Sequence, residues 1–292
     1  MEPIADRIFL VPGAKGGRFP FSHSILVLDR VRVLIDTGCG QETLAWVEER
    51  YAPDMVLLTH AHPDHCSGTA LFPPSRVWTP RESRRSTGRL ERMAERFIRP
   101  ALREEWISFM RSAVGFREFA PGNSYGAGDR FDLGSLTLVP VHAPGHADDH
   151  YCFYFPEAAV MATTDIDFTR FGPWYANDEG DIDTFLESIE RVRSHPMEAA
   201  VSSHEGVVRD DIQGRFERFA STFGEREERL LGLLERPRTL ESIVDKAIIY
   251  GSFPVRPRIL RFWERQMIGK HLERLQAAGR VRRTDEGYLR AR

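Results

Sequence analysis

The stretch Thr59-His-Ala-His-Pro-Asp-His-Cys-Ser-Gly68 concentrates metal-binding side chains more densely than any other part of the chain. It contains His60, His62, Asp64 and His65. Imidazole nitrogens suit zinc, iron and related divalent ions, and a nearby carboxylate adds negative charge that favours a second cation. We therefore expect a metal site here, and we regard a histidine-rich loop without a metal as the weaker interpretation.

The residues on either side of this stretch indicate where it lies in a fold. Met55–Leu58 is a short apolar run typical of a buried strand. The histidines thus begin where a strand ends, which is where open α/β sheets bind their ligands. Residues 67–69 (Ser-Gly-Thr) read as the start of a helix, whose amide dipoles would lie close to the site.

The pattern His-x-His-x-Asp-His resembles the signature of the metallo-β-lactamase-fold hydrolases. Four further segments resemble motifs of that family and follow in the family's order: Val33-Leu-Ile-Asp-Thr-Gly38, Ala143-Pro-Gly-His146, Ala162-Thr-Thr-Asp165 and Val201-Ser-Ser-His204. The resemblance covers most of residues 1–220. It implies an α/β fold, the αββα sandwich of that family.

The resemblance also implies two metal positions and a carboxylate between them. It assigns His60, His62 and His146 to the first metal, Asp64, His65 and His204 to the second, and Asp165 to the bridge. Asp64 would also orient the nucleophile and so act in catalysis. We expect two divalent ions, zinc first, with iron or manganese as alternatives. Such a pair lowers the pKa of bound water, so that a metal-bridging hydroxide can attack the substrate.

The last ligand departs from the family pattern. The family usually has Pro-Gly-His-Gly there, whereas this chain has Ser202-Ser-His-Glu-Gly206. His195 is a competing candidate, but it lies at the end of a segment with a helical pattern. We therefore prefer His204.

The ligand set separates branches of the family. A cysteine ligand of the second metal would resemble one class of true β-lactamase, but Asp165 stands in that place and the three cysteines match no ligand position. A glutamate at the second position of the motif would resemble the diiron flavoproteins, but His62 stands there. The set therefore favours hydrolysis over redox chemistry. We interpret Cys66, next to a ligand, as a small packed side chain.

Five other residues are candidates for supporting the site. Asp36 is an expected acceptor for a ligand histidine. His150 is either such a supporting group or a residue at a strand entry, and we prefer the second. Phe171, Trp174 and Tyr175 follow the bridging aspartate closely. They either form a pocket wall that receives an apolar acyl group or anchor their own loop, and we leave both open.

Composition sets the class of protein. The chain has 292 residues, of which 41% are hydrophobic and 28% are charged, as in a soluble globular protein. No apolar run is long enough to cross a membrane, and the first residues lack the features of a signal peptide. Three widely spaced cysteines do not support a disulfide framework. We expect a cytoplasmic protein without a membrane partner.

Hydrophobic periodicity predicts the main elements. We expect strands over residues 4–11, 24–29, 31–35, 55–58, 136–141, 151–155 and 159–162, and helices over 42–50 and 182–193. Residues 81–120 interrupt this pattern with a polar, helix-favouring insertion. Ten arginines and six glutamates lie within residues 81–119. This insertion either covers the metals or only pads the surface.

The chain changes character near residue 224. Helices are expected over 230–234, 240–249 and 259–275, and a β-hairpin over 281–289. This order resembles a winged-helix module, so we predict a catalytic domain at 1–220 and a winged-helix-like domain at 224–292. Residues 221–292 carry a net charge of +6 and the rest −9. We favour a structural or pocket-closing role over nucleic-acid binding.

Three functions fit these observations. The first is a dinuclear-metal hydrolase of a small ester or thioester, as in the glyoxalase II-like relatives. The alternative is a metal-dependent endoribonuclease whose basic C-terminal domain holds single-stranded RNA. The third is a non-enzymatic regulator that binds nucleic acid, which the intact ligand set argues against. A homodimer is left open.

Overall fold

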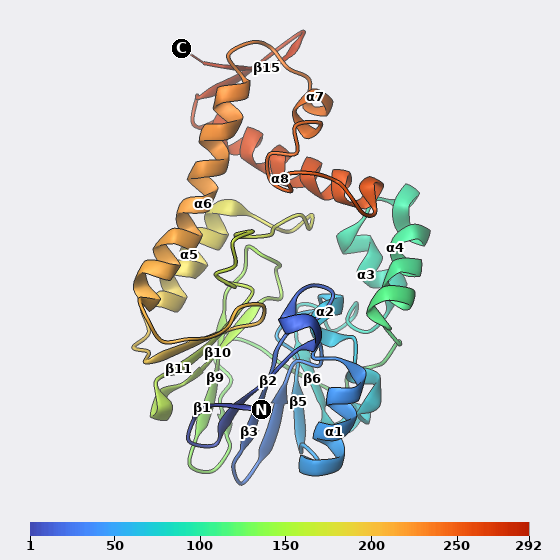
Figure 1. Ribbon diagram of the computed structural model, residues 1–292, viewed down its shortest axis with the longest axis vertical. Helices are drawn as coiled ribbons and strands as arrows, with labels where there is room; N and C mark the ends of the chain where they lie inside the picture. The colour runs from blue at the N-terminus through green and yellow to red at the C-terminus, as the bar shows by residue number, and fades with distance from the viewer. Residues whose placement is uncertain (292) are drawn as a thin grey trace.

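Two β-sheets packed face to face form the centre of the computed structural model, which describes residues 1–291 (Figure 1). The first sheet has the strand order β1-β2-β3-β4-β5-β6-β7, with β1 (Glu2–Ala5), β2 (Ile8–Val11), β3 (Ser24–Leu28), β4 (Arg32–Ile35), β5 (Met55–Leu57), β6 (Val77–Pro80) and β7 (Asn123–Tyr125). The second has the order β13-β12-β11-β10-β9-β8, with β8 (Phe131–Asp132), β9 (Thr137–His142), β10 (Tyr151–Phe155), β11 (Val160–Thr164), β12 (Ala199–Ser202) and β13 (Gly206–Val208).

Alternation along the strands builds two apolar layers. Val27 of β3 and Phe153 of β10 belong to a buried cluster that draws side chains from both sheets, whereas the neighbouring Leu26 and Cys152 belong to another cluster. This is the period-2 pattern expected when both faces of a strand are covered. The sandwich therefore has one core between its sheets and further core on the outer faces.

Helices cover those outer faces. α1 (Gln41–Tyr51) lies against the first sheet, and α5 (Ile182–Arg193) and α6 (Ile212–Leu233) lie against the second (Figure 1). Leu44 and Val47 of α1 and Ile189 and Val192 of α5 are fully buried, at the spacing that places apolar residues on one helical face. The layers are therefore α, β, β and α.

Most elements predicted within residues 1–220 agree with the structure, and two do not. The helix expected over 182–193 has those bounds. The strand expected over 4–11 is wrong, because a turn with Arg7 at φ +65° divides it into β1 and β2. The helix expected to start at residues 67–69 starts earlier, as α2 (Pro63–Cys66). Pro63 explains the earlier start, since proline suits the first helical position.

The insertion is helical, as predicted. It contains α3 (Leu90–Phe97) and α4 (Arg103–Phe109). Met93, Phe97 and Trp106 are buried in the same cluster as the outer faces of the sheets, so the apolar side of the insertion packs onto the body of the protein. Figure 1 places these helices beside α8, across from α5 and α6.

The C-terminal segment has a core of its own. It comprises the end of α6, α7 (Leu240–Val244), α8 (Pro257–Ala277) and the hairpin of β14 (Val281–Thr284) and β15 (Gly287–Arg290). Leu230, Ile243, Leu272 and Val281 are buried together. The helix predicted over 240–249 ends early, at Val244. α6 runs without a break through residues 220–224, so the division into two domains and the winged-helix-like character of the second stay proposals.

None of the helices within residues 1–291 is both long and apolar enough to span a membrane.

Candidate metal centre

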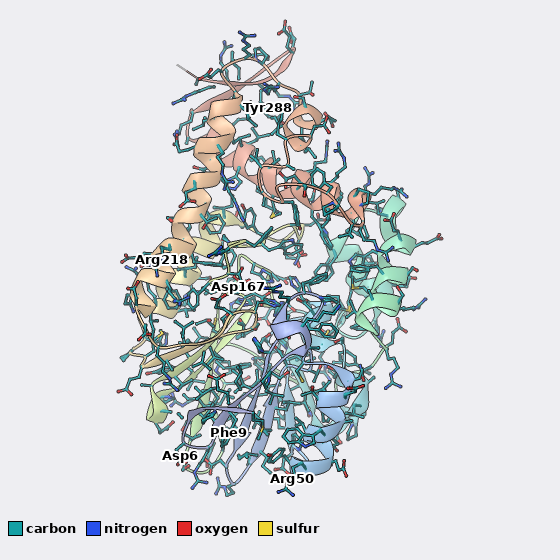
Figure 2. All side chains as sticks on the ribbon, in the orientation of Figure 1. Asp6, Phe9, Arg50, Asp167, Arg218 and Tyr288 are labelled. Carbon is teal, nitrogen blue, oxygen red and sulfur yellow. The ribbon has the colours of Figure 1, made fainter. Side chains whose placement is uncertain are left out.

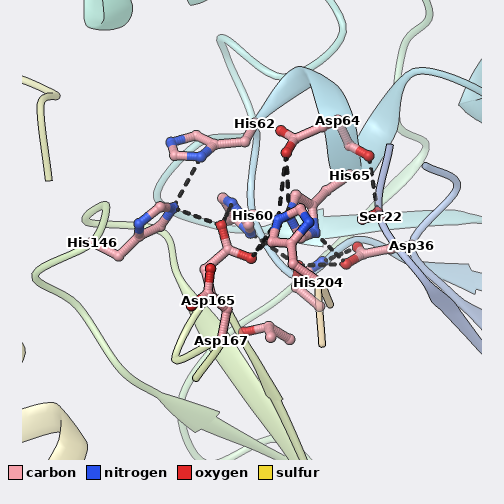
Figure 3. A network of polar contacts seen from close by, with 12 residues as sticks. Ser22, Asp36, His60, His62, Asp64, His65, His146, Asp165, Asp167 and His204 are labelled. Carbon is pink, nitrogen blue, oxygen red and sulfur yellow. Dashed lines mark hydrogen bonds and ion pairs between the residues drawn. The ribbon is translucent and has the colours of Figure 1, made fainter. Parts of the chain in front are cut away.

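Seven side chains from four segments of the chain meet at one edge of the sandwich (Figure 3). They form two groups, and within each group all donor atoms lie within 4.8 Å of one another. The first group is His60, His62, His146 and Asp165, and the second group is Asp64, His65 and His204. Every residue that the sequence proposes as a metal ligand belongs to one of these groups. His195 belongs to neither.

The strands explain why these residues converge. β5 ends at Leu57, just before the histidine-rich stretch, and β11 ends one residue before Asp165. β12 ends at Ser202, two residues before His204, and runs parallel to β11. Because the carboxyl ends of parallel strands lie at the same edge of a sheet, each strand brings its donor to the same place.

Asp36 fixes the orientation of two histidines. Its Oδ2 lies 2.8 Å from His65 Nδ1 and accepts a hydrogen bond from Thr59 Oγ1 at 2.8 Å. Thr59 Oγ1 in turn lies 2.9 Å from His60 Nδ1. The Nε2 atoms of His60 and His65 therefore face the donor groups, because hydrogen bonds occupy the other ring nitrogens. Asp36 lies at φ +58°, an uncommon backbone conformation for a residue with a side chain.

The other two histidines of the first group are oriented from a loop that follows β11. His146 Nδ1 lies 2.7 Å from the carbonyl oxygen of Trp174, so its Nε2 points inward. His62 Nε2 lies 2.9 Å from the side-chain amide of Asn177, and its Nδ1 faces His146 Nε2 at 2.9 Å. A half-turn of this amide directs the otherwise unpartnered Asn177 Oδ1 toward Nε2–H and leaves His62 Nδ1 free to bind a metal.

The N-terminal part of the chain orients His204. Its Nδ1 lies 2.7 Å from the carbonyl oxygen of Gly17. Gly17 has φ +72°, and a Cβ there would lie 2.6 Å from His23 Nε2, so only glycine fits this turn. His195 lies elsewhere: its Nδ1 is 3.0 Å from the carbonyl oxygen of Arg191, and its ring packs 5.0 Å from that of Tyr154.

Asp165 lies between the two groups (Figure 3). Its Oδ2 is 3.1 Å from His146 Nε2 and 3.6 Å from His60 Nε2. Its Oδ1 is 3.0 Å from His65 Nε2 and 3.7 Å from His204 Nε2. Burial alone would raise the pKa of this carboxyl, but His65 and His146 hold it well below its usual range, so Asp165 is ionised.

The neutral rings of His60 and His62 and three unpaired atoms fit bound cations, whereas, despite burial, Asp165 and its neighbouring carboxylates raise the pKa values of His65 and His204. Burial and the neighbouring imidazoles lower the pKa values of His60 and His62 well below 6.5, which leaves both rings neutral, as metal ligands must be. Within residues 1–291, buried His60 Nε2, His65 Nε2 and Asp165 Oδ1 form no well-directed hydrogen bond, although the last two atoms lie 3.0 Å apart. Buried polar atoms are rarely left this way, and a cation between the groups would satisfy all three.

His150 lies directly behind the ligands. Its Nδ1 is 2.8 Å from the carbonyl oxygen of Ala143, and its Nε2 is 2.5 Å from Thr164 Oγ1. Its ring centroid is 5.3 Å from those of His60 and His146. Burial and then His146 lower its pKa to about 3, so the ring is neutral. His150 thus supports the turn before Asp165 and has no nitrogen free for a metal.

The three loop aromatics have different surroundings. The ring of Trp174 meets that of His62 edge-on at 5.3 Å, so this side chain borders the first group. Tyr175 is fully buried away from the groups, with its hydroxyl 2.6 Å from His271 Nε2 of α8. Phe171 packs 5.3 Å from Tyr250 in the C-terminal segment. The site-wall interpretation therefore fits Trp174, and the anchoring interpretation fits Phe171 and Tyr175.

The insertion and the C-terminal segment both reach the first group. The ring of Phe97 in α3 lies 4.7 Å from that of His62. Trp263 of α8 packs 5.5 Å from Trp174, and its Nε1 donates to the carbonyl oxygen of Phe97 at 2.8 Å. Trp174 Nε1 also donates to the hydroxyl of Tyr250 at 2.9 Å. The apolar side of the metal centre is therefore assembled from three distant parts of the chain.

The sequence analysis missed several supporting residues. Asp149 Oδ2 accepts from the backbone N–H of Ala61, and its Oδ1 accepts from Arg96 of the insertion at 2.7 Å. Asp167 lies near the middle of the molecule (Figure 2), and burial raises its pKa to about 6 although His204 opposes this shift. Asp149 could have been identified from the sequence, because it directly precedes the candidate His150. Asn177 and Arg96 carried none, because only the tertiary fold brings them to the site.

Comparison with known proteins agrees with this geometry. Residues 17–204 match the family model of the metallo-beta-lactamase superfamily, and the chain belongs to that superfamily. A metallo-beta-lactamase family protein from Thermus thermophilus superposes with a TM-score of 0.74, over 99% of this chain and 100% of that one, at 23% identity. The predicted αββα fold is thereby confirmed.

Two fungal relatives point to the class of reaction. The atrochrysone carboxyl ACP thioesterase dmxR1 of Cryptosporiopsis sp. (strain 8999) is 25% identical, over 88% of this chain and 71% of its own length. The lactamase-like protein aptB of Emericella nidulans is 28% identical, over 80% of this chain and 68% of its own length. The chain is a metal-dependent hydrolase, with its histidine and aspartate cluster as the metal-binding site.

Proposed function

We propose that this hydrolase binds two divalent ions and cleaves a small thioester or ester. The position of Asp165 carries the proposal. Its two oxygens face different donor groups, at 3.1 Å from His146 Nε2 and 3.0 Å from His65 Nε2, as expected of a carboxylate shared by two cations. Zinc is our preferred metal, because five imidazoles dominate the donors, while iron and manganese accept the same donor types.

The relatives favour a thioester over other esters. Two of them, from Cryptosporiopsis sp. (strain 8999) and Claviceps purpurea, are named as atrochrysone carboxyl ACP thioesterases. A thioester hydrolase also suits the apolar side of the centre, where Phe97 and Trp174 lie against His62. We propose that these two rings border the acyl group of the substrate and exclude bulk water from it.

The residues of the chain have distinct roles in this reaction. Bound divalent ions would supply Lewis-acid activation of water and of the thioester carbonyl. Asp64, whose Oδ2 lies 3.6 Å from His204 Nε2, would orient the attacking water as well as bind an ion. Cys66 does not serve as a nucleophile in this scheme, because burial raises its pKa well above 9 and its thiol donates to the carbonyl oxygen of His62.

Hydrolysis of S-lactoylglutathione and of an acyl group on a carrier protein tests the reaction class. We expect metal-dependent turnover of at least one of them, lost in Asp165→Ala and kept in His195→Ala. Metal analysis should give two ions per chain in the native protein. Two bound ions without turnover of either thioester, but with metal-dependent cleavage of single-stranded RNA, would reject the thioester and favour the alternative.

The endoribonuclease alternative rests on the net charge of the C-terminal segment. Four arginines there lie on or just before α8: Arg256, Arg258, Arg261 and Arg265. Three of them pair with carboxylates, Arg258 with Glu105, Arg261 with Asp245 and Arg265 with Glu241. The fourth lies over the ring of Phe109 at 4.9 Å. Because these contacts engage the charges, we prefer the thioesterase.

The C-terminal segment would then help to form one wall of the substrate pocket. Trp263 and Tyr250 hold Trp174 against the first donor group, which supports a pocket-closing role for a winged-helix-like domain at 224–292. A cytoplasmic location remains part of this proposal. Cleavage between residues 220 and 240 followed by metal analysis would test the dependence of the site on that segment.

A further inference from the structure

A groove of about 840 Å³ lies on the insertion, outside the metal centre. Its charged lining consists of five arginines and one glutamate: Arg84, Arg85, Arg89, Arg92, Arg96 and Glu95. The residues come from the loop after β6 and from α3, so nearby segments of the chain build one cationic hollow. Its volume lies within the range of about 300–1,000 Å³ typical of small-molecule sites.

Most of this positive charge has no counterpart in the protein. Within residues 1–291, Arg84, Arg85 and Arg89 form no ion pair, and all three are exposed. Arg92 pairs with Glu95 at 3.3 Å. Guanidinium groups held this close repel one another, and an anion bound among them removes that repulsion.

Arg96 also lines the groove, and it has a buried donor without a partner among the described residues. Its Nε and Nη2 bond to Glu179 at 2.7 Å, to Asp148 at 2.6 Å and to Asp149 at 2.7 Å. Its Nη1 is buried and, among residues 1–291, has no hydrogen-bond acceptor. A buried donor left unpaired is costly, so an acceptor from a bound ligand would stabilise this arrangement.

We propose that this groove is a binding site for a small ligand that carries at least two phosphate groups. Guanidinium groups match phosphate oxygens in paired, charge-assisted hydrogen bonds, and two phosphates suit a groove with three exposed arginines that form no ion pair within the part of the chain that the structure describes. The proposal goes beyond the hydrolytic function and involves no metal. Arg96 also links the groove to the metal centre, because Asp149 accepts from the backbone N–H of Ala61, between His60 and His62.

Calorimetry with adenosine 3′,5′-bisphosphate tests the site, with adenosine as the uncharged control. The test variant is Arg84→Ala/Arg85→Ala, and the matched variant Arg50→Ala/Arg282→Ala removes the same charge from exposed positions elsewhere. We expect saturable binding of the bisphosphate but not of adenosine. The test variant should bind at least about tenfold more weakly, because it lacks two of the exposed guanidinium donors; tenfold corresponds to about 1.4 kcal/mol.

The other outcomes reject the proposal. Equal weakening in both double variants would mean that net charge alone attracts the ligand. Binding that survives Arg84→Ala/Arg85→Ala but is lost in Asp165→Ala would mean that the phosphates bind the metal centre. Arginine-dependent binding of a single-stranded RNA oligonucleotide without binding of the bisphosphate would assign the groove to nucleic acid. None of these binding measurements needs turnover. The test of the groove can therefore be interpreted even if the protein does not hydrolyse a thioester.

Discussion

The first and second donor groups of the metal centre are held by different parts of the chain. In the first group, His146 is oriented by the carbonyl oxygen of Trp174, in a loop that packs on the C-terminal segment. In the second, His65 bonds to Asp36 and His204 bonds to Gly17, both from the N-terminal quarter of the chain. The two groups therefore depend mainly on different supports, and Asp36 contributes to both because it also reaches His60 through Thr59.

The support of the first group extends to a buried arginine. Arg226 of α6 is only 1% exposed and donates to the carbonyl oxygens of Phe171 at 2.6 Å and Pro173 at 2.5 Å, and to the Tyr175 hydroxyl at 3.0 Å. These three residues surround Trp174 in the same loop. α6 thus fixes the backbone that orients a metal ligand, whereas the second group needs no C-terminal residue. Substitutions that affect one group and spare the other test this difference.

Loss of Asp165 should have the largest effect, because its two carboxylate oxygens face histidines of both groups. We expect Asp165→Ala to lower the metal content of both groups and to reduce turnover by orders of magnitude. Metal analysis and the thioester assay measure this. Two bound ions with full activity in the variant would contradict the shared position of Asp165.

His204→Ala should remove one ion and spare the other. Its Nε2 faces Asp64 and Asp165, while the first group keeps its three histidines. We expect metal content to fall by one equivalent and turnover to be lost. His195→Ala serves as the control and should leave both quantities unchanged. Loss of one ion in His195→Ala but not in His204→Ala would mean that His195, and not His204, is the metal ligand.

Asp36→Asn should weaken the second group without emptying it, and should weaken the first group less, because Asp36 reaches His60 only through Thr59. The change removes the charge that His65 Nδ1 contacts at 2.8 Å, and loss of such a partner typically costs about 10–100-fold in metal affinity. Competition with a chelator measures the affinity of each ion. Asp54→Asn, in an exposed ion pair with Arg32, is the matched control. An equal loss in both variants would mean that Asp36 does not act through His65.

Arg226→Met should weaken the first group by a smaller factor, which we expect to be about tenfold or less. The variant keeps the length of the side chain but leaves the loop carbonyl oxygens without their charged donor. With cobalt in place of the native metal, the visible spectrum should change for the ion bound through His146 only. Arg218→Met, exposed on the same helix, is the control. An unchanged spectrum would show that Arg226 does not influence the metal bound through His146.

The smallest expected effect is a pH dependence of stability at His271, which contacts Tyr175. Burial lowers the pKa of this ring below 6.5, although Glu227 opposes the shift. As the pH falls below 6.5, His271 is protonated in the unfolded chain before it is protonated in the folded chain. The contribution of neutral His271 to the free energy of unfolding is therefore complete above pH 6.5 and is lost as the pH falls.

Denaturation of the native protein and of His271→Gln between pH 8 and 5 tests this sign. The difference in their free energies of unfolding should shrink toward pH 5, by at most about 1.4 kcal/mol per pH unit. A difference that is constant with pH would show that His271 does not titrate differently on folding.

The sequence by itself predicted the candidate donors that the fold brings together. The stretch from His60 to His65 and the three later motifs lie at strand ends, and strand ends are visible as apolar runs that stop at polar residues. Asp36 was foreseeable for the same reason. The helix over 182–193 was also foreseeable, because its apolar residues repeat with the period of a helix.

Only the tertiary structure decided how those donors are held. Asn177, Arg226 and Trp263 lie in segments whose local pattern carries no sign of a metal, and folding brings them to His62, to the loop around Trp174 and to Phe97. The same is true of the arginine groove, whose charges look like an ordinary solvated insertion in the sequence. The physical reason is that donor chemistry belongs to single residues, whereas orientation, burial and charge balance depend on contacts between residues far apart in the chain.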